Sequence, residues 1–237
     1  MLLSWLESPR QWSNDNAGFL ALLLFLVTVA LGWASGVFRS LRRRPLLRLD
    51  VNPGPTFACT FGTGNQYKGH EAHRTAFCIY LAITNRGTAP TDIIEVTLGY
   101  HNYTPKYTFL WCWLEHQTVA LADFQVSLGE HTKIYPFLTQ MNQLLPTTPD
   151  TYLQEGRQTR GVVYFEQLEA WGGWLPRVKA RETKVKVRVM DAYGRQHSEV
   201  FRIPIVTLED ARKYNPLFGA TFDALQSARQ QPEQADA

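Results

Sequence analysis

One uninterrupted apolar run stands out from the hydrophobic and polar pattern along the chain. Residues 17–38 read AGFLALLLFLVTVALGWASGVF and contain 22 residues without a charge. At a rise of about 1.5 Å per residue, a helix of this length spans roughly 33 Å, enough for the hydrocarbon core of a bilayer. Trp12 and Trp33 lie near its two ends, where indole rings favour the membrane interface. We therefore expect a transmembrane helix at 17–38, after a short flank at 1–16.

Two other interpretations of the run fit less well. A buried core helix would show amphipathic spacing, and residues 17–38 show none. A cleaved signal peptide would begin with a basic segment, whereas residues 1–16 carry Arg10 against Glu7 and Asp15. The run is also longer than the apolar part of most signal peptides.

Beyond Pro45 the apolar positions recur with a period of two, which is typical of half-buried strands. The pattern predicts strands at 47–51, 75–84, 92–100, 107–115, 119–128, 161–167, 183–190 and 197–205. Ile94, Val96 and Leu98 are expected to share one strand face. Residues 52–74, rich in Gly and Pro, are expected to be a loop or a poorly paired edge. The pattern at 134–145 is ambiguous, and a short helix is one structure that fits it.

The carboxyl end changes character. Thr207 and Asp210 form a capping box that predicts a short helix through Tyr214. Residues 217–229 carry apolar positions at helical spacing and predict a second helix, before a polar, disordered tail at 230–237. The predicted organisation is the flank 1–16, the membrane helix 17–38, a basic linker 39–45, a β domain 46–206, a helical segment 207–229 and the tail.

The strand–turn–strand unit around NRGTAP (residues 85–90) and the hairpin VMDAYGRQHS (residues 189–198) resemble parts of immunoglobulin-like domains. Many bacterial membrane-anchored and surface proteins carry such domains. The resemblance implies a mainly β fold over residues 46–206, an antiparallel immunoglobulin-like β-sandwich. The Cys, Trp, Cys arrangement of antibody domains is not evident.

Basic residues cluster directly after the apolar run, and they set the expected orientation. This cluster comprises Arg39, Arg42, Arg43, Arg44 and Arg48. The positive-inside rule places it in the cytoplasm, with the amino terminus outside and the β domain inside. The resemblance to bacterial membrane-anchored proteins implies that this membrane is the inner (cytoplasmic) membrane of a bacterium. The same guanidinium groups are suited to anionic lipid headgroups. The overall net charge is only +3, and an odd count of 3 cysteines is unlike a disulfide framework.

Candidate chemistry is sparse. Gly156 and Gly161 match the start of a phosphate-binding loop, but Val162 and Val163 follow in place of Lys and Ser or Thr. Two thiols and two imidazoles at irregular spacing are the best zinc candidates: Cys59, His70, His73 and Cys78. A zinc-dependent enzyme is thus one alternative, although the sequence favours a protein that is not an enzyme and has no cofactor, metal or small-molecule substrate.

Aromatic and basic side chains offer binding surfaces instead. Trp111 and Trp113 share one strand face, with Tyr103 and Tyr107 nearby, and they fit either the inter-sheet core or a partner-binding patch. The basic positions of 177–188 alternate with valines, so a solvated sheet face explains them better than a nucleic-acid surface. The leading hypothesis is a single-pass adaptor that binds the bilayer and holds a protein partner at its cytoplasmic face. The same domain on the envelope or surface side is the alternative.

Overall fold

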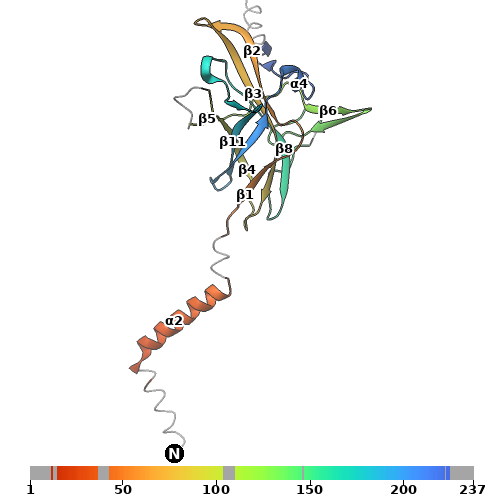
Figure 1. Ribbon diagram of the computed structural model, residues 1–237. Helices are drawn as coiled ribbons and strands as arrows, with labels where there is room; N and C mark the ends of the chain where they lie inside the picture. Colours follow the sequence, from red (N-terminus) through yellow and green to blue (C-terminus); the bar gives the residue numbers. More distant parts are fainter. Residues whose placement is uncertain are drawn as a thin grey trace, which may run out of the picture. The chain divides into compact units, whose positions relative to one another are not determined.

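The computed structural model describes residues 12, 15–36, 43–103, 110–145, 147–221 and 223–224. The chain divides into two compact units, Met1–Arg44 and Pro45–Ala237. The first contains an apolar helix and the second contains the sheets (Figure 1).

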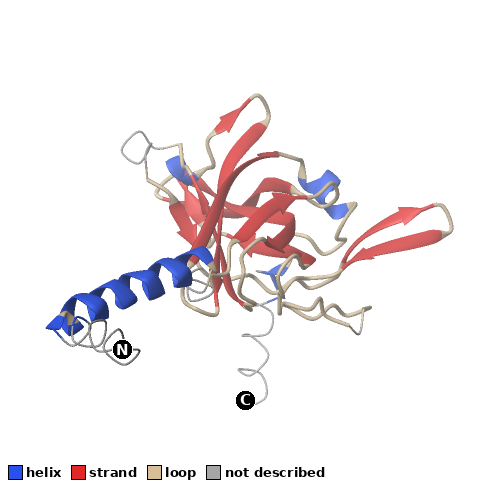
Figure 2. Cartoon of the chain, turned by 90° about the horizontal axis from the view of Figure 1, so that it is seen from below, coloured by secondary structure: helices blue, strands red, loops and turns tan. Residues whose placement is uncertain are grey.

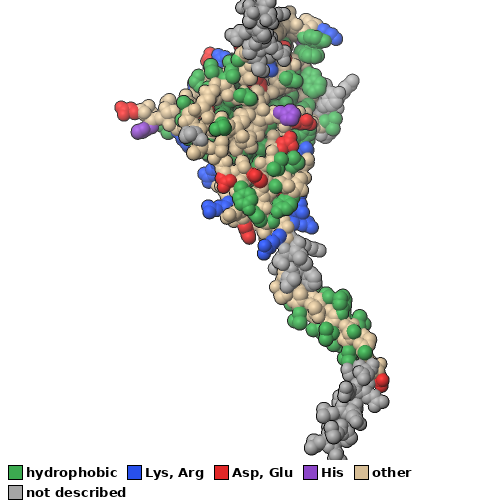
Figure 3. Space-filling model, turned by 180° about the vertical axis from the view of Figure 1, so that it is seen from behind, with side chains coloured by type: hydrophobic (Ala, Val, Ile, Leu, Met, Phe, Trp, Pro, Cys, Tyr) green, Lys and Arg blue, Asp and Glu red, His purple; other side chains and the backbone are tan. Residues whose placement is uncertain are grey.

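The helix of the first unit, α2 (Ala17–Ala34), is long and apolar enough to cross a membrane. Its 18 residues span about 27 Å, close to the roughly 30 Å of a bilayer core. None of them is buried, and the face of the helix seen in Figure 3 carries mostly apolar side chains. The hydroxyl of Thr28 donates to the carbonyl of Leu24 at 2.7 Å, so this polar group is satisfied within the helix.

The helix ends earlier than the apolar run predicts. Gly36 has φ of 77°, and its N–H donates to the carbonyl of Trp33 at 3.2 Å. Glycine adopts this left-handed conformation readily, and such a residue closes a helix. The continuation to residue 38 lies outside the described residues.

Two five-stranded antiparallel sheets form the second unit, together with a separate hairpin. The first sheet contains β1 (Leu47–Val51), β2 (Phe57–Tyr67), β3 (His70–Asn85), β8 (Gln158–Glu166) and β9 (Ala170–Trp171). The second contains β4 (Ile93–Tyr100), β5 (Cys112–Leu114), β10 (Val178–Lys179), β11 (Glu182–Asp191) and β12 (Gln196–Pro204). The hairpin is β6 (Phe124–Leu128) with β7 (His131–Tyr135), and it extends away from both sheets (Figure 2).

The main apolar core lies between the two sheets, as the alternating pattern predicts. Phe77, Ile79, Leu81 and Ile83 of β3 face this core, opposite the valines of β11. The valines are Val185, Val187 and Val189, all fully buried. The expected phase of these two strands is therefore confirmed.

The expected phase of β4 is wrong at its first residues. Ile93 is 6% exposed, whereas Ile94 is 57% exposed. The pairing with β11 is irregular here, because Met190 lies opposite Glu95 and Asp191 lies opposite Ile93. Ile94 is thus the extra residue of a β-bulge, which turns it to the solvent side.

A second apolar cluster covers the other face of the first sheet. Phe57, Cys78 and Tyr164 of that sheet pack with Phe124 of β6 and with Phe218 near the carboxyl end. The short helix α4 (Leu208–Arg212) also contributes to this layer, through Ala211. The first sheet is therefore buried on both faces, which a single sandwich of two sheets would not require.

Other predicted segments differ from the structure. Residues 52–74 contain β2 and the start of β3, which pair along most of their length around an irregularity between Gly62 and Gln66. Residues 134–145 form the end of β7 and a loop rather than a helix.

The predicted cap of α4 is confirmed, because Thr207 Oγ1 accepts from the N–H of Asp210 at 3.2 Å. Most of 217–229 and all of 230–237 lie outside the described residues.

A polar contact set joins β1 to the turn between β11 and β12. Asp191 accepts hydrogen bonds from the N–H groups of Tyr193 and Arg195, both at 2.9 Å, and from Nε2 of His197 at 2.9 Å. Nδ1 of His197 accepts from the N–H of Leu47 at 3.3 Å. A ring that donates from Nε2 and accepts at Nδ1 is the neutral tautomer.

Candidate partner-binding face

Trp111 and Trp113 lie on the outer face of the second sheet. Cys112 and Leu114, which alternate with them, pack against the inter-sheet core, so the two indole rings point away from it. Both tryptophans are half-buried. The interpretation of this pair as inter-sheet core is therefore wrong, and the rings are accessible on the surface.

Cationic side chains from β11 hold the two rings. The guanidinium Cζ of Arg188 lies 3.8 Å from the centroid of Trp113, and Nζ of Lys186 lies 5.9 Å from that of Trp111. The ring of His101 stacks on Trp111 with centroids 4.0 Å apart. A cation over an indole face is an attractive electrostatic contact, so these residues form an ordered row.

Gly99 of β4 provides the space in which the rings lie. It is the cross-strand partner of Trp113. A Cβ atom at this position would come within 3.1 Å of the Trp113 ring and 3.3 Å of Trp111 Cβ. We name Gly99, Trp111, Trp113, Lys186 and Arg188 the indole row.

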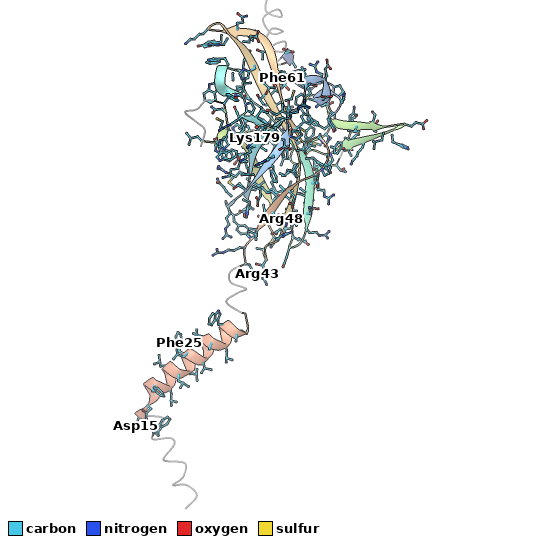
Figure 4. All side chains as sticks on the ribbon, viewed as in Figure 1. Asp15, Phe25, Arg43, Arg48, Phe61 and Lys179 are labelled. Atoms are coloured by element: carbon cyan, nitrogen blue, oxygen red, sulfur yellow. The ribbon has the colours of Figure 1, made fainter. Side chains whose placement is uncertain are left out.

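Two hollows flank the indole row. The first, about 350 Å³, we call the basic hollow, and its lining includes His101, Arg177, Lys179, Glu182, Lys184 and Arg202. The second, about 330 Å³, we call the glutamate hollow, and its lining includes Glu95, Thr97, Trp113, Glu115, Arg188 and Gln196. Figure 4 marks Lys179, the β10 residue that lines the basic hollow.

Of the two predicted tyrosines, the structure describes Tyr103, which does not extend the indole row. Tyr103 is 65% exposed, and its N–H donates to the carbonyls of Gly173 and Leu175 at 3.1 and 2.8 Å. It thus lies beside the 3₁₀ helix η2 (Gly172–Trp174). Tyr107 lies outside the described residues.

The predicted topology cluster is described only in part. Arg39 and Arg42 lie outside the described residues, and Arg43 and Arg44 are exposed. Arg48 belongs to β1, where its Nε lies 3.0 Å from a carboxylate oxygen of Asp50 (Figure 4). Both side chains of this pair are about half exposed, so the contact contributes little to stability.

The four zinc candidates are not brought together. Cys59 and Cys78 are buried in the second apolar cluster, on one face of the first sheet. His73 is an odd number of residues from Cys78 in the same strand, so its side chain projects from the opposite face. His70 is exposed near the β2–β3 turn. Among the described residues, no group of three His, Cys, Asp or Glu side chains is placed to hold a metal ion.

The thiols are also poorly suited to nucleophilic chemistry. Burial raises the pKa of Cys59 to about 11, although the charge of Arg212 opposes the shift. Burial likewise raises the pKa of Cys78 well above its ordinary value and raises that of Cys112. Since the thiolate is the reactive form, these environments disfavour reaction at neutral pH.

Sequence reasoning identified the tryptophans but missed the basic hollow. Arg202 belongs to β12 and His101 directly follows β4, and only the pairing of these two strands with β11 brings both residues near the 177–188 stretch. The usable signal was the alternation of Lys184, Lys186 and Arg188 with buried valines, which marks the outer face.

No protein-family model matches the chain, and the curated proteins include no significant match to it. The fold and the site define the class directly. Within the described residues, the chain is a mainly β protein of two five-stranded antiparallel sheets and a hairpin, with one apolar helix near its amino terminus that is long enough to span a membrane.

Proposed function

We propose that the chain is a single-pass adaptor of the bacterial inner membrane. Its amino terminus lies outside, and its β domain, an immunoglobulin-like sandwich, holds a protein partner at the cytoplasmic membrane face. The indole row is the contact surface for the partner.

The observation that carries this proposal is the position of Trp111 and Trp113 outside the core. Soluble proteins bury large aromatic rings, and Trp, Tyr and Arg are the residues that most often dominate binding at interfaces. Here two indoles and a stacked guanidinium are ordered on one outer sheet face between two hollows. The cation contacts already restrict these rings, which reduces the entropy lost when a partner docks.

The anchor and the fold likeness have their own support. The helix α2 has the length and composition of a membrane span, and the five arginines from Arg39 to Arg48 follow it. Two antiparallel sheets over a shared core are the architecture expected of an immunoglobulin-like domain.

The test is recovery of the partner from cells by coprecipitation with the full-length chain. We expect Trp111→Ala with Trp113→Ala to reduce recovery at least about tenfold, because aromatic hot spots contribute about 2 kcal/mol or more each. Trp111→Phe with Trp113→Phe retains ring packing over Gly99, and we expect a smaller loss.

The matched control removes two other exposed indoles, Trp171→Ala with Trp174→Ala. These are 39% and 42% exposed, lie in and beside η2, and belong neither to the indole row nor to the lining of the two hollows. We expect unchanged recovery for this variant. Equal recovery by the folded Trp111 and Trp113 variant would remove the indole row as the contact surface.

A further inference from the structure

Two cationic side chains on the outer face of the second sheet, Lys184 and Arg202, make no contact with an indole ring of the indole row. Lys186 lies over the ring of Trp111, and Arg188 lies over that of Trp113. Lys184 continues the same row of β11 and lies directly opposite Arg202 of β12. Like charges at opposed positions of an antiparallel pair repel each other. Neither side chain has an acidic partner within 4.0 Å in the part of the chain that the structure describes.

The basic hollow concentrates this excess of positive charge. Arg177 and Lys179 reach it from the segment before β11, and Glu182 is the one carboxylate among the described residues that line it. His101 is oriented by its stacking on Trp111 and by Nδ1, which lies 3.1 Å from the carbonyl oxygen of Leu110. Since a carbonyl oxygen only accepts, Nδ1 carries the hydrogen. An anion in the hollow would offset the mutual repulsion of its cations.

The glutamate hollow decides which anion fits. Glu95 and Glu115 line it on the other side of the tryptophans, within the same sheet face. A flat anionic bilayer or a nucleic-acid backbone would place phosphates against these carboxylates as well as over the cations. A peptide segment, in contrast, can place acidic side chains on one side and neutral or basic ones on the other.

We infer that the basic hollow binds carboxylate side chains of an acidic segment in the protein partner. This inference rests on the proposed function and adds the chemistry of the partner. Lys184 and Arg202 bind the carboxylates, Arg177 and Lys179 contribute to the attractive field, and the neighbouring indoles contact the adjoining residues of the segment.

The test uses the full-length chain in a non-ionic detergent and a fluorescent peptide of six glutamates, with a peptide of six glutamines as the uncharged comparison. We expect the wild type to bind the glutamate peptide in preference and to lose affinity as salt rises. Lys184→Glu with Arg202→Glu should weaken this binding about tenfold or more, because two attractive charges become repulsive.

The control makes the same change of net charge elsewhere. Lys133 of β7 and Arg160 of β8 are exposed strand residues outside the second sheet, and we expect Lys133→Glu with Arg160→Glu to retain at least most of the affinity. Lys184→Gln with Arg202→Gln should give an intermediate loss and guards against unfolding of the reversed variant.

Three results would overturn the inference: no preference for the glutamate peptide, equal weakening in both charge-reversed variants, or unchanged binding by the folded Lys184 and Arg202 variants. Binding to vesicles of phosphatidylglycerol and phosphatidylcholine, lost in those variants without any binding of the peptide, would identify a lipid site instead. Loss of partner recovery in the Trp111 and Trp113 variant, with no peptide binding, would keep the proposed function and reject the acidic segment.

Discussion

At the scale of single residues, Asp191 is a buried acid that stabilises the β11–β12 turn through hydrogen bonds. It accepts three hydrogen bonds at 2.9 Å, two from backbone N–H groups and one from His197. Burial by itself would raise the pKa of Asp191, but these hydrogen bonds, that from His197 foremost, bring it below its ordinary value of 3.8. The charged carboxylate therefore stabilises the folded chain.

Asp191→Asn should lower the free energy of unfolding by about 2–3 kcal/mol at neutral pH, because hydrogen bonds to a charged group contribute about 1.5–3 kcal/mol. A carboxyl group whose pKa is lower in the folded state stabilises the fold at pH values above its pKa in the unfolded state. This stabilisation is lost as the pH falls through the pKa of the folded state. The difference in the free energy of unfolding between variant and wild type should thus decrease below about pH 3.8. Urea unfolding across pH measures it, and a difference independent of pH would contradict the assignment.

Burial also predicts an order of reactivity for the three thiols. Cys59 and Cys78 are fully buried, whereas Cys112 is half-buried beside the indole row. Alkylation by iodoacetamide at pH 8, followed by mass spectrometry, should modify Cys112 first and the other two only after unfolding in urea. Modification of Cys59 at the rate of Cys112 in the native chain would show that the second apolar cluster opens readily.

At the scale of elements, β8 approaches the loop after β7 so closely that one position excludes any side chain. A Cβ atom on Gly161 would meet the backbone Cα and N of Leu138 at 2.4 and 2.5 Å. The N–H of Leu138 donates to the carbonyl of Val162 at 2.9 Å, and the N–H of Val162 donates to that of Pro136 at 2.7 Å. These bonds fix the separation of the two segments.

Gly161→Ala should therefore destabilise the fold by about 1–3 kcal/mol or more, the cost of overpacking a close contact. Gly156→Ala does not test the same effect, since Gly156 has φ of 73° and would be strained for that reason. Gly62 is the suitable control, because a Cβ atom added there would have a single neighbouring atom, at 4.0 Å. Thermal unfolding of Gly161→Ala and Gly62→Ala compares the two positions. Equal melting temperatures would contradict the close approach of β8 to the loop after β7.

The elements also show which parts of the fold the sequence determines locally. Strands with one buried and one exposed face, such as β11, can be predicted from the sequence, because alternate side chains of a strand point to opposite faces and give a period of two. The phase of β4 was mispredicted at Ile94 because a bulge depends on the partner strand. Strand β2 was missed because its glycines are common in loops, whereas its pairing with β3 is a tertiary property.

The candidate site likewise has one part that the sequence predicts locally and one part that depends on strand pairing. The sequence identified Trp111 and Trp113 and their shared face, but two apolar side chains alternate with two others, Cys112 and Leu114, so the pattern does not say which pair is buried. The basic hollow depends on the pairing of β4, β11 and β12, and no local pattern contains Arg202 and His101 together. The two hollows and the cation–ring contacts thus required the structure.

At the scale of the whole molecule, the small net charge divides unevenly along the chain. Residues 1–45 carry 5 basic and 2 acidic residues, and 4 of the basic ones follow the apolar run directly. Residues 46–206 are nearly balanced, with 16 basic and 14 acidic residues. The net positive charge of residues 1–45 therefore lies directly after the apolar run, where it sets the expected orientation in a membrane.

This distribution predicts the result of a protease experiment on spheroplasts. The β domain should resist added protease until the membrane is opened by detergent, while a tag fused to the amino terminus should be cleaved from outside. Replacing the four arginines of 39–44 by serine should give a mixed orientation, with part of the β domain digested, because the positive-inside signal is removed. Those four are Arg39, Arg42, Arg43 and Arg44.

The control replaces four exposed arginines of the β domain and therefore changes the net charge equally. They are Arg86, Arg157, Arg160 and Arg195. Because charges far from the span in the sequence contribute little to orientation, this variant should remain protected. Digestion of the wild-type β domain in sealed spheroplasts would place it outside, and the indole row and the basic hollow would then have to serve a partner in the envelope.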